Sequence, residues 1–190
     1  MTERDRDDAG RAQNARPRDE LGRPLPPGSA GIARIPDDLD LPPDETLTFA
    51  QQLLDDGLAF NAHEVLEAAW KNGPFAERML WQGLAQLAVG VTHIQRGNRR
   101  GARTLLTRAV FRLTASSDSL QNPDGTDTPQ TSDPTAAERP YLAHDPDDDP
   151  YGIDRAGLIA YAEGLIAALD DHTEITEDRL RPRLRHRPLG

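Results

Sequence analysis

The sequence contains no cysteine. Without thiols the chain has no disulfide scaffold, no thiolate metal site and no cysteine nucleophile. It also lacks any run of about 18 apolar residues, so we expect no membrane-spanning helix. Its first twenty residues lack the apolar core of a secretory signal, which predicts a cytoplasmic protein.

Hydrophobic residues are scarce, at 36% of 190 positions, whereas globular chains usually have about 45–50% apolar residues. The deficit lies in three segments. Residues 1–44 are rich in proline and glycine without a helical period, which predicts an extended arm. Residues 116–153 are polar and strongly acidic, which predicts a long insertion, and residues 173–190 form an Arg-rich tail. A helical domain is expected at 45–172.

Helical periodicity runs through the centre of the chain, and no segment alternates as a strand does. We therefore predict an all-α fold, a compact bundle of about five helices with disordered flanks. The helices are expected at about 45–56, 60–72, 75–96, 98–115 and 155–171, with the core motif at 58–115.

The predicted helix at 75–96 carries no charged side chain between Arg78 and Arg96, and its apolar residues point all around the axis. A helix that is apolar on every side is buried on every side, so we expect this helix at the centre of the bundle. Gln82, Gln86 and His93 stand out on it, because they lie within about 40° of one line.

The preceding helix carries a matching polar group. Glu67 and Trp70 lie within about 40° of His63, on the side of the helix expected to face the core. Glu64 lies at the edge of that side. An unpaired carboxylate beside a core costs several kcal/mol, so we predict that these groups pair with the polar line of the next helix. The candidate ligand site comprises His63, Glu64, Glu67, Trp70, Gln82, Gln86 and His93.

Two sequence segments, FNAHEVLEAAW and WQGLAQLAVGVTHIQRGNRRGA, closely resemble the motif pair of the family known as domain of unknown function 309. The resemblance covers roughly residues 45–115. The arm segment RAQNARPRDELGRPLP resembles that of the actinobacterial branch. The resemblance implies an α-helical bundle and no established activity. Many members have a histidine where this chain has Asn61, which weakens any metal role for that position.

The pattern His63-Glu64-x-x-Glu67 also resembles the one-turn ligand spacing of zinc proteases, with Glu67 in place of the second histidine. His63, Glu67 and His93 could bind a divalent metal and leave one position open. Three interpretations stay open: a buried network that fixes helix register, a pocket for a small molecule or peptide, and a metal site. The leading function is a non-enzymatic binding or interaction module. The alternative is a metal-dependent, hydrolase-like enzyme using His63, Glu64, Glu67 and His93.

Arg99, Arg100 and Arg103 surround the expected start of the fourth helix, where a phosphate could bind. Arg108 and Arg112 lie about 180–220° around that helix from Arg99, so the charge forms no single stripe. No aromatic residue lies among Arg99, Arg100 and Arg103, as it would in many nucleic-acid surfaces. We therefore expect neither nucleic acid nor a membrane as partner, and a second copy of the chain or another protein stays open.

Overall fold

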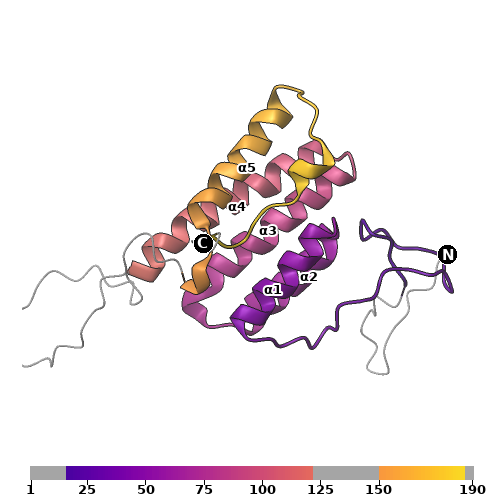
Figure 1. The fold of residues 1–190 in the computed structure, drawn as a ribbon, viewed down its shortest axis with the longest axis horizontal. Coiled ribbons are helices and arrows are strands. Elements are labelled where there is room, and N and C mark those ends of the chain that lie inside the picture. The colour runs from indigo at the N-terminus through magenta and orange to yellow at the C-terminus, as the bar shows by residue number, and fades with distance from the viewer. Residues whose placement is uncertain (1–15, 122–149, 187–190) are drawn as a thin grey trace, which may run out of the picture.

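The computed structural model describes residues 16–121 and 150–186, with side chains through residue 115 in the first range. Within these ranges the secondary structure is helical, apart from isolated bridges. The predicted all-α bundle is confirmed (Figure 1). Its elements are α1 (Pro43–Asp55), α2 (Ala59–Asn72), η1 (Phe75–Glu77), α3 (Arg78–Gln95), α4 (Arg99–Gln121), η2 (Pro150–Gly152), α5 (Arg155–Asp170) and η3 (Glu177–Leu180).

The helices end close to their predicted limits, and the differences have local causes. Helix α1 begins at Pro43, before the predicted start, because the fixed φ of proline suits the first helical turn. The third predicted helix divides into the 3-10 turn η1 and α3. Asp154 caps α5, since its side chain accepts a hydrogen bond from Gly157 N at 2.9 Å. Helix α4 runs to Gln121, so the helix extends into the predicted insertion.

Helix α3 is buried from Leu80 to Thr92 except along one stripe, where Gln82, Gln86, Val89 and His93 are half-buried. The expectation that this helix is buried on every side is therefore corrected for that stripe.

Helix α3 packs against α2 on one side and α4 on the other. Two glycines allow the close approach of α4: a Cβ at Gly83 would lie 3.0 Å from the Leu113 side chain, and one at Gly90 would lie 2.7 Å from that of Leu106. Any larger residue at these two positions would push the helices apart.

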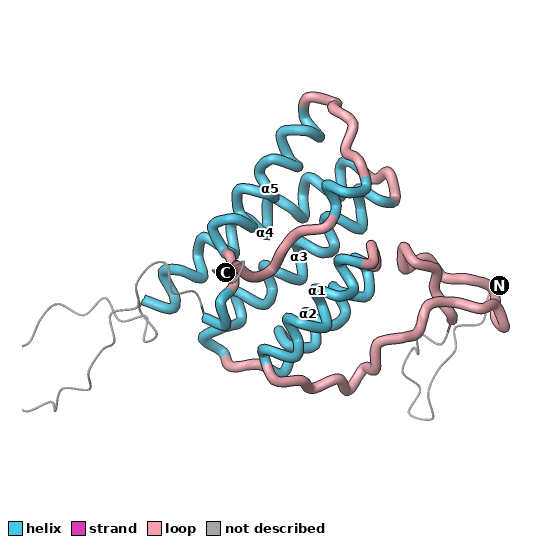
Figure 2. Tube along the Cα trace, in the orientation of Figure 1, coloured by secondary structure: helices cyan, strands magenta, loops and turns pink. Residues whose placement is uncertain are grey.

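Each helix of the bundle packs against the next along the chain, with α1 on α2 and α5 on α4 (Figures 1 and 2). None of the helices in the described ranges has both the length and the apolar character needed to cross a bilayer.

The described parts of the flanks lie on the bundle, which corrects the expectation of disordered flanks for these residues. The arm packs through Ile35, which is 8% exposed, and the C-terminal segment packs through Leu180 and Leu184, at 5% and 1%. Figure 2 shows both as long loops, and the C-terminal segment includes the short 3-10 helix η3. Most of the predicted acidic insertion, residues 122–149, lies outside the described residues.

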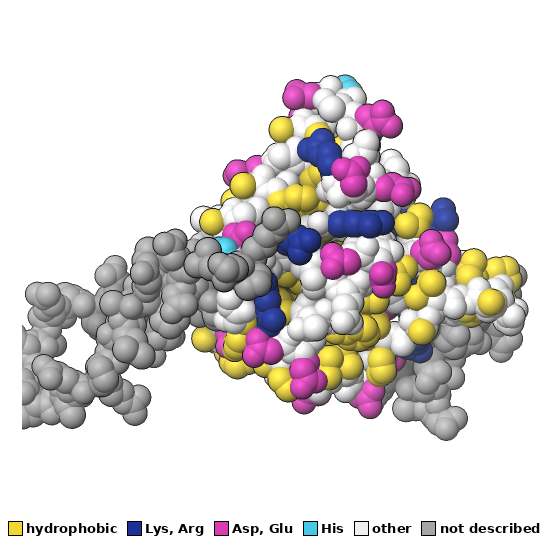
Figure 3. Space-filling model, in the orientation of Figure 1, with side chains coloured by type: hydrophobic (Ala, Val, Ile, Leu, Met, Phe, Trp, Pro, Cys, Tyr) yellow, Lys and Arg dark blue, Asp and Glu magenta, His cyan; other side chains and the backbone are white. Residues whose placement is uncertain are grey.

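The C-terminal segment is held by a glutamine of α1. Gln51 Nε2 donates to Pro182 O at 3.1 Å, and Gln51 Oε1 accepts from Leu184 N at 2.8 Å. The side-chain amide thus takes the place of a neighbouring strand. Arg185 adds an ion pair of 2.5 Å with Asp44. Figure 3 shows Lys and Arg side chains gathered in the middle of this face, where Figure 1 places the C-terminal segment.

Replacing this glutamine should loosen the segment. We expect Gln51→Ala to lower the free energy of unfolding by about 1–3 kcal/mol, because two partly buried backbone groups lose their partner. Gln52→Ala is the matched control, since Gln52 is the exposed neighbour on the same helix. Urea unfolding measures both variants. Equal stability of the two variants would contradict the bridging role.

Candidate functional site

The polar residues predicted on α2 form a row along one edge of that helix. His63 Nε2 and Glu67 Oε2 are 3.7 Å apart, and Lys71 Nζ lies 3.2 Å from Glu67 Oε1. His63, Glu64 and Glu67 are all half-buried. Trp70 is half-buried as well and packs against the core.

The polar residues predicted on α3 have partners elsewhere. Gln86 Oε1 accepts a hydrogen bond from Arg112 Nε of α4 at 3.1 Å. His93 Nδ1 lies 2.7 Å from Nδ2 of Asn98, the residue that caps α4. Gln82 is half-buried. The contacts of Gln86 and His93 therefore connect α3 with α4, whereas the prediction had them face the polar row of α2.

Among the described side chains, those of residues 16–115 and 150–186, no three His, Asp or Glu groups are arranged to hold a metal ion. The predicted set of His63, Glu67 and His93 is therefore not formed, which corrects the metal-site hypothesis for the described residues. The reason is that His93 faces α4, where a Cβ added at Gly101 would lie 2.5 Å from its Nδ1. His63 lies instead beside Glu67 on α2.

Of the three arginines predicted to contact phosphate, two bind the end of α5. Arg99 donates to the carbonyl oxygen of Leu169, in the last turn of α5. Arg103 Nε forms an ion pair of 2.8 Å with Asp170 Oδ1. A cation near the last carbonyls of a helix is favoured by the helix dipole. Arg100 is exposed.

Phe60, at the start of α2, is where the arm, α2 and the end of α3 meet. The guanidinium carbons of Arg18 and Arg96 lie 5.2 and 5.5 Å from its ring centroid, within cation–π range. A Cβ added at Gly22 would lie 2.2 Å from the same ring, so the arm backbone rests directly on it. We call Arg18, Gly22, Phe60 and Arg96 the arm clasp.

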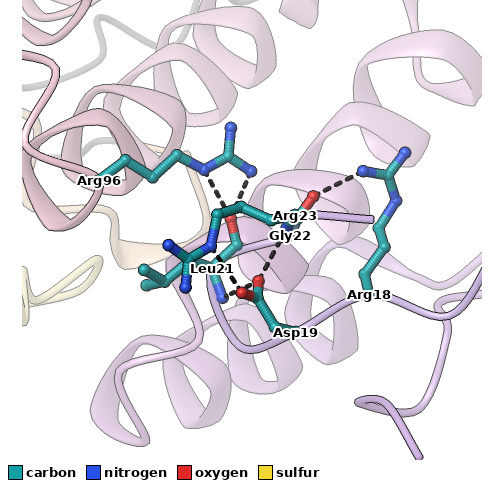
Figure 4. Close-up of polar contacts among 6 residues, drawn as sticks. All are labelled: Arg18, Asp19, Leu21, Gly22, Arg23 and Arg96. Atoms are coloured by element: carbon teal, nitrogen blue, oxygen red, sulfur yellow. Dashed lines mark hydrogen bonds and ion pairs between the residues drawn. The ribbon is translucent and has the colours of Figure 1, made fainter. Parts of the chain in front are cut away.

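Hydrogen bonds hold the arm loop in the clasp (Figure 4). Arg96 Nε donates to Leu21 O at 2.7 Å, and Arg18 Nη1 donates to Gly22 O at 2.6 Å. Asp19 Oδ1 accepts from Leu21 N at 3.0 Å. The loop bends at Gly22, whose φ of +72° is strained for any residue with a Cβ.

His63 lies beneath this clasp, with its ring centroid 5.9 Å from that of Phe60. Burial lowers the pKa of His63, and Lys71 and Arg96 lower it further. Glu67 and a hydrogen bond with the Phe60 backbone act in the opposite direction. The net direction is downward, so the neutral imidazole is the favoured form next to the clasp.

A cavity of about 440 Å³ opens beside the clasp, between the arm and α2. We call it the arm cavity. Three arginines of the arm line it, namely Arg16, Arg18 and Arg34, and Arg34 also pairs with Asp37. Helix α2 lines the cavity with Phe60, Asn61 and Glu64.

The two polar residues of α2 that line this cavity are a buried amide with an unsatisfied oxygen and a half-buried carboxylate. Asn61 is 4% exposed, and its Nδ2 donates to Ala33 O at 3.3 Å, while its buried Oδ1 has no hydrogen-bond partner among the described residues. Glu64 is half-buried, and burial raises the pKa of its carboxyl although Arg18 and Arg34 lower it. An ionic or N–H donor would satisfy both groups.

The helical phases identified Glu64 and His63 but missed the arm clasp. Helical periodicity cannot place an arm that has no period. The available signal was local: Gly22 lies in a segment dense in proline, where an isolated glycine often marks a turn with positive φ. Nothing in the spacing linked that turn to Phe60 or to Arg96.

Comparison with known proteins relates the centre of the chain to one family. Residues 47–105 match the protein family described as Domain of unknown function (DUF309). The uncharacterized protein YpuF of Bacillus subtilis is 40% identical over 57 residues, a match that covers 30% of this chain and 33% of that protein. The match therefore spans about a third of YpuF. No solved structure is similar enough to match the chain.

The matched region covers α2, α3 and the first part of α4, together with most of α1. It contains Phe60, Asn61, Glu64 and Arg96, which are the bundle's contributions to the clasp and to the arm cavity. The arm residues that complete both features lie before it.

A methyl group at Gly22 should release the arm. Gly22→Ala adds a Cβ to a positive-φ residue and drives it into the Phe60 ring, whereas Gly28→Ala has the same strain at φ +81° but no atom within 4 Å. We expect Gly22→Ala to cost about 1–3 kcal/mol more than Gly28→Ala. Amide hydrogen exchange of residues 19–32 and thermal unfolding measure the difference. Indistinguishable variants would rule out the contact.

The lowered pKa of His63 gives the stability a pH dependence. A histidine in the unfolded chain titrates near pH 6.5. Above about that pH the side chain is neutral in both states, and its burial costs the folded state no protonation energy. As the pH falls, the unfolded chain takes up the proton first and the folded state loses stability. Between about pH 7.5 and about pH 5, we expect the free energy of unfolding in urea to fall less for His63→Gln than for the wild type. His93, whose pKa burial also lowers, should supply part of the remainder.

The control for this series is Gln52→Ala, because it changes an exposed side chain that does not titrate. Its free energy of unfolding should depend on pH as that of the wild type does. An unchanged pH dependence of the free energy of unfolding in His63→Gln would show that the pKa of His63 is the same in the folded and unfolded states.

Proposed function

We propose that this chain is a non-enzymatic binding module whose ligand enters the arm cavity. The observation that carries the proposal is the pair of acceptors in this cavity. Asn61 Oδ1 is buried without a donor, and Glu64 is a half-buried carboxylate. Folded proteins rarely leave such groups unsatisfied, because each costs about 1–3 kcal/mol.

The other side of the cavity favours an anionic group. Arg16 and Arg18 reach it from the arm, and a guanidinium binds a carboxylate or phosphate through two parallel N–H donors. Arg34 lines the cavity too, although Asp37 shares its charge. The lining thus offers acceptors from α2 and donors from the arm.

A ligand that fits this arrangement carries an ammonium group at one end and an anionic group at the other. Free α-amino acids have this chemistry. The volume of about 440 Å³ suits them, since ligand cavities usually measure about 300–1,000 Å³. We therefore propose a small zwitterion, such as a free amino acid, as the ligand class.

The alternative of a hydrolase has less support. It needs His63, Glu64, Glu67 and His93 around one substrate. His93 instead lies beside Asn98 at the corner between α3 and α4, and Glu64 lies on the arm cavity. A binding role uses Glu64 where it lies and needs no other residue of that set.

The test titrates the twenty free amino acids, each at up to about 10 mM, into ¹⁵N-labelled protein. We expect one group of probes to shift the amide signals of residues 28–34 and 60–64. N-acetylation or C-amidation of such a probe should abolish its effect, because either change removes one of the two charges.

The variants compare two adjacent turns of α2. Glu64→Gln should weaken binding at least about tenfold, and it should not lower the melting temperature of the free protein, because a neutral amide avoids the cost of a desolvated carboxylate. Glu67→Gln is the control, since Glu67 pairs with Lys71 and does not line the cavity. No response to any probe, or equal weakening by both variants, would overturn the proposal.

A further inference from the structure

A larger cavity lies on the other side of the arm loop. It measures about 810 Å³ and is bounded by residues 19–32 of the arm, by the corners after α1 and α3, and by the C-terminal segment at 175–181. We call it the arm–tail groove. Its apolar lining comes from three separate parts of the chain, through Leu21, Leu25, Ile32, Ile94, Ile175 and Leu180.

The charge of this groove is predominantly negative. Glu20, Asp56 and Glu177 line it, all three are exposed, and none forms an ion pair with another described residue. Asp19 also lines it but neutralises Arg23 at 2.6 Å. Arg181 is the remaining cation of the lining. A phosphate backbone would be repelled here, and a cationic partner attracted.

The groove also offers a hydrogen-bond acceptor. Gln95 lines it, and its Nε2 is fixed by a hydrogen bond of 2.8 Å to Gly57 O. The Oε1 atom of the same side chain is buried and has no partner among the described residues. A ligand N–H that reached this oxygen after a small shift of the side chain would satisfy it.

The molecule already binds one segment with the same three elements. Its C-terminal segment alternates arginine with Leu180, Pro182 and Leu184, and it is held by a glutamine amide, by a carboxylate on Arg185 and by burial of its leucines. The arm–tail groove repeats this set with Gln95, with its three carboxylates and with its Leu and Ile lining.

We infer that the arm–tail groove is a docking site for a linear basic peptide in which arginine alternates with apolar residues. The arginines contact Glu20, Asp56 and Glu177, the apolar side chains cover the Leu and Ile lining, and one backbone N–H bonds to Gln95. This site is separate from the arm cavity and does not depend on the ligand proposed there.

The probe is a fluorescein-labelled peptide with the sequence of residues 179–186, RLRPRLRH. Fluorescence anisotropy should show saturable binding to the full chain. The variant Glu20→Gln/Asp56→Asn/Glu177→Gln should weaken it at least about tenfold.

The matched control is Asp38→Asn/Glu45→Gln/Glu163→Gln, which removes the same charge from exposed positions outside the groove. It should bind the peptide within about twofold of wild type. Equal weakening by the two triple variants would mean that net charge alone attracts the peptide, and would overturn the proposal. Absence of saturable binding, or tighter binding of a single-stranded RNA of similar length, would overturn it as well.

Discussion

The close approach of α3 and α4 is the constraint on which the rest of the structure depends. Gly83 and Gly90 leave room for the side chains of Leu113 and Leu106, so α4 lies directly against α3. Most side chains of helix α3 between Leu80 and Thr92 are apolar and buried, and α2 and α4 both pack against it. Once α2, α3 and α4 are fixed in this way, α1 and α5 cover the outer helices, and the nonhelical flanks have a rigid surface on which to lie.

The position of both proposed sites follows from how α3 ends. Its last turn leaves the core at Gly97, whose φ of +71° stops the helix, and this places Arg96 at the surface above Phe60. Arg96 then binds Leu21 O and brings the arm across the start of α2. One side of the arm loop becomes the arm cavity, and the other becomes a wall of the arm–tail groove. An arm that detached would remove both.

The helices were predictable because their signals are local and periodic. Gly57 and Gly97 stop α1 and α3 where the sequence indicated, and Asp154 caps α5. The site was predictable only in part. Helical phase placed His63 and Glu67 on one edge of α2 but could not say which helix His93 faces, because a line of polar residues on a helix packed between two neighbours can turn to either of them. It turns to α4, where Asn98 is one turn away along the chain. The flanks were not predictable, since their order comes from tertiary contacts such as that of Gly22 with Phe60.

An all-α bundle has no sheet edge, so its extended segments need another source of backbone partners. Gln51 supplies one, because a single amide offers a donor to Pro182 O and an acceptor to Leu184 N, as a neighbouring strand would. Gln95 has the same chemistry but uses only its donor, on Gly57 O. The difference is geometric: the C-terminal segment passes Gln51 with both backbone groups in reach, and no described residue donates to the Oε1 of Gln95. The unsatisfied acceptor therefore marks the place along the arm–tail groove where an extended segment has the most to gain.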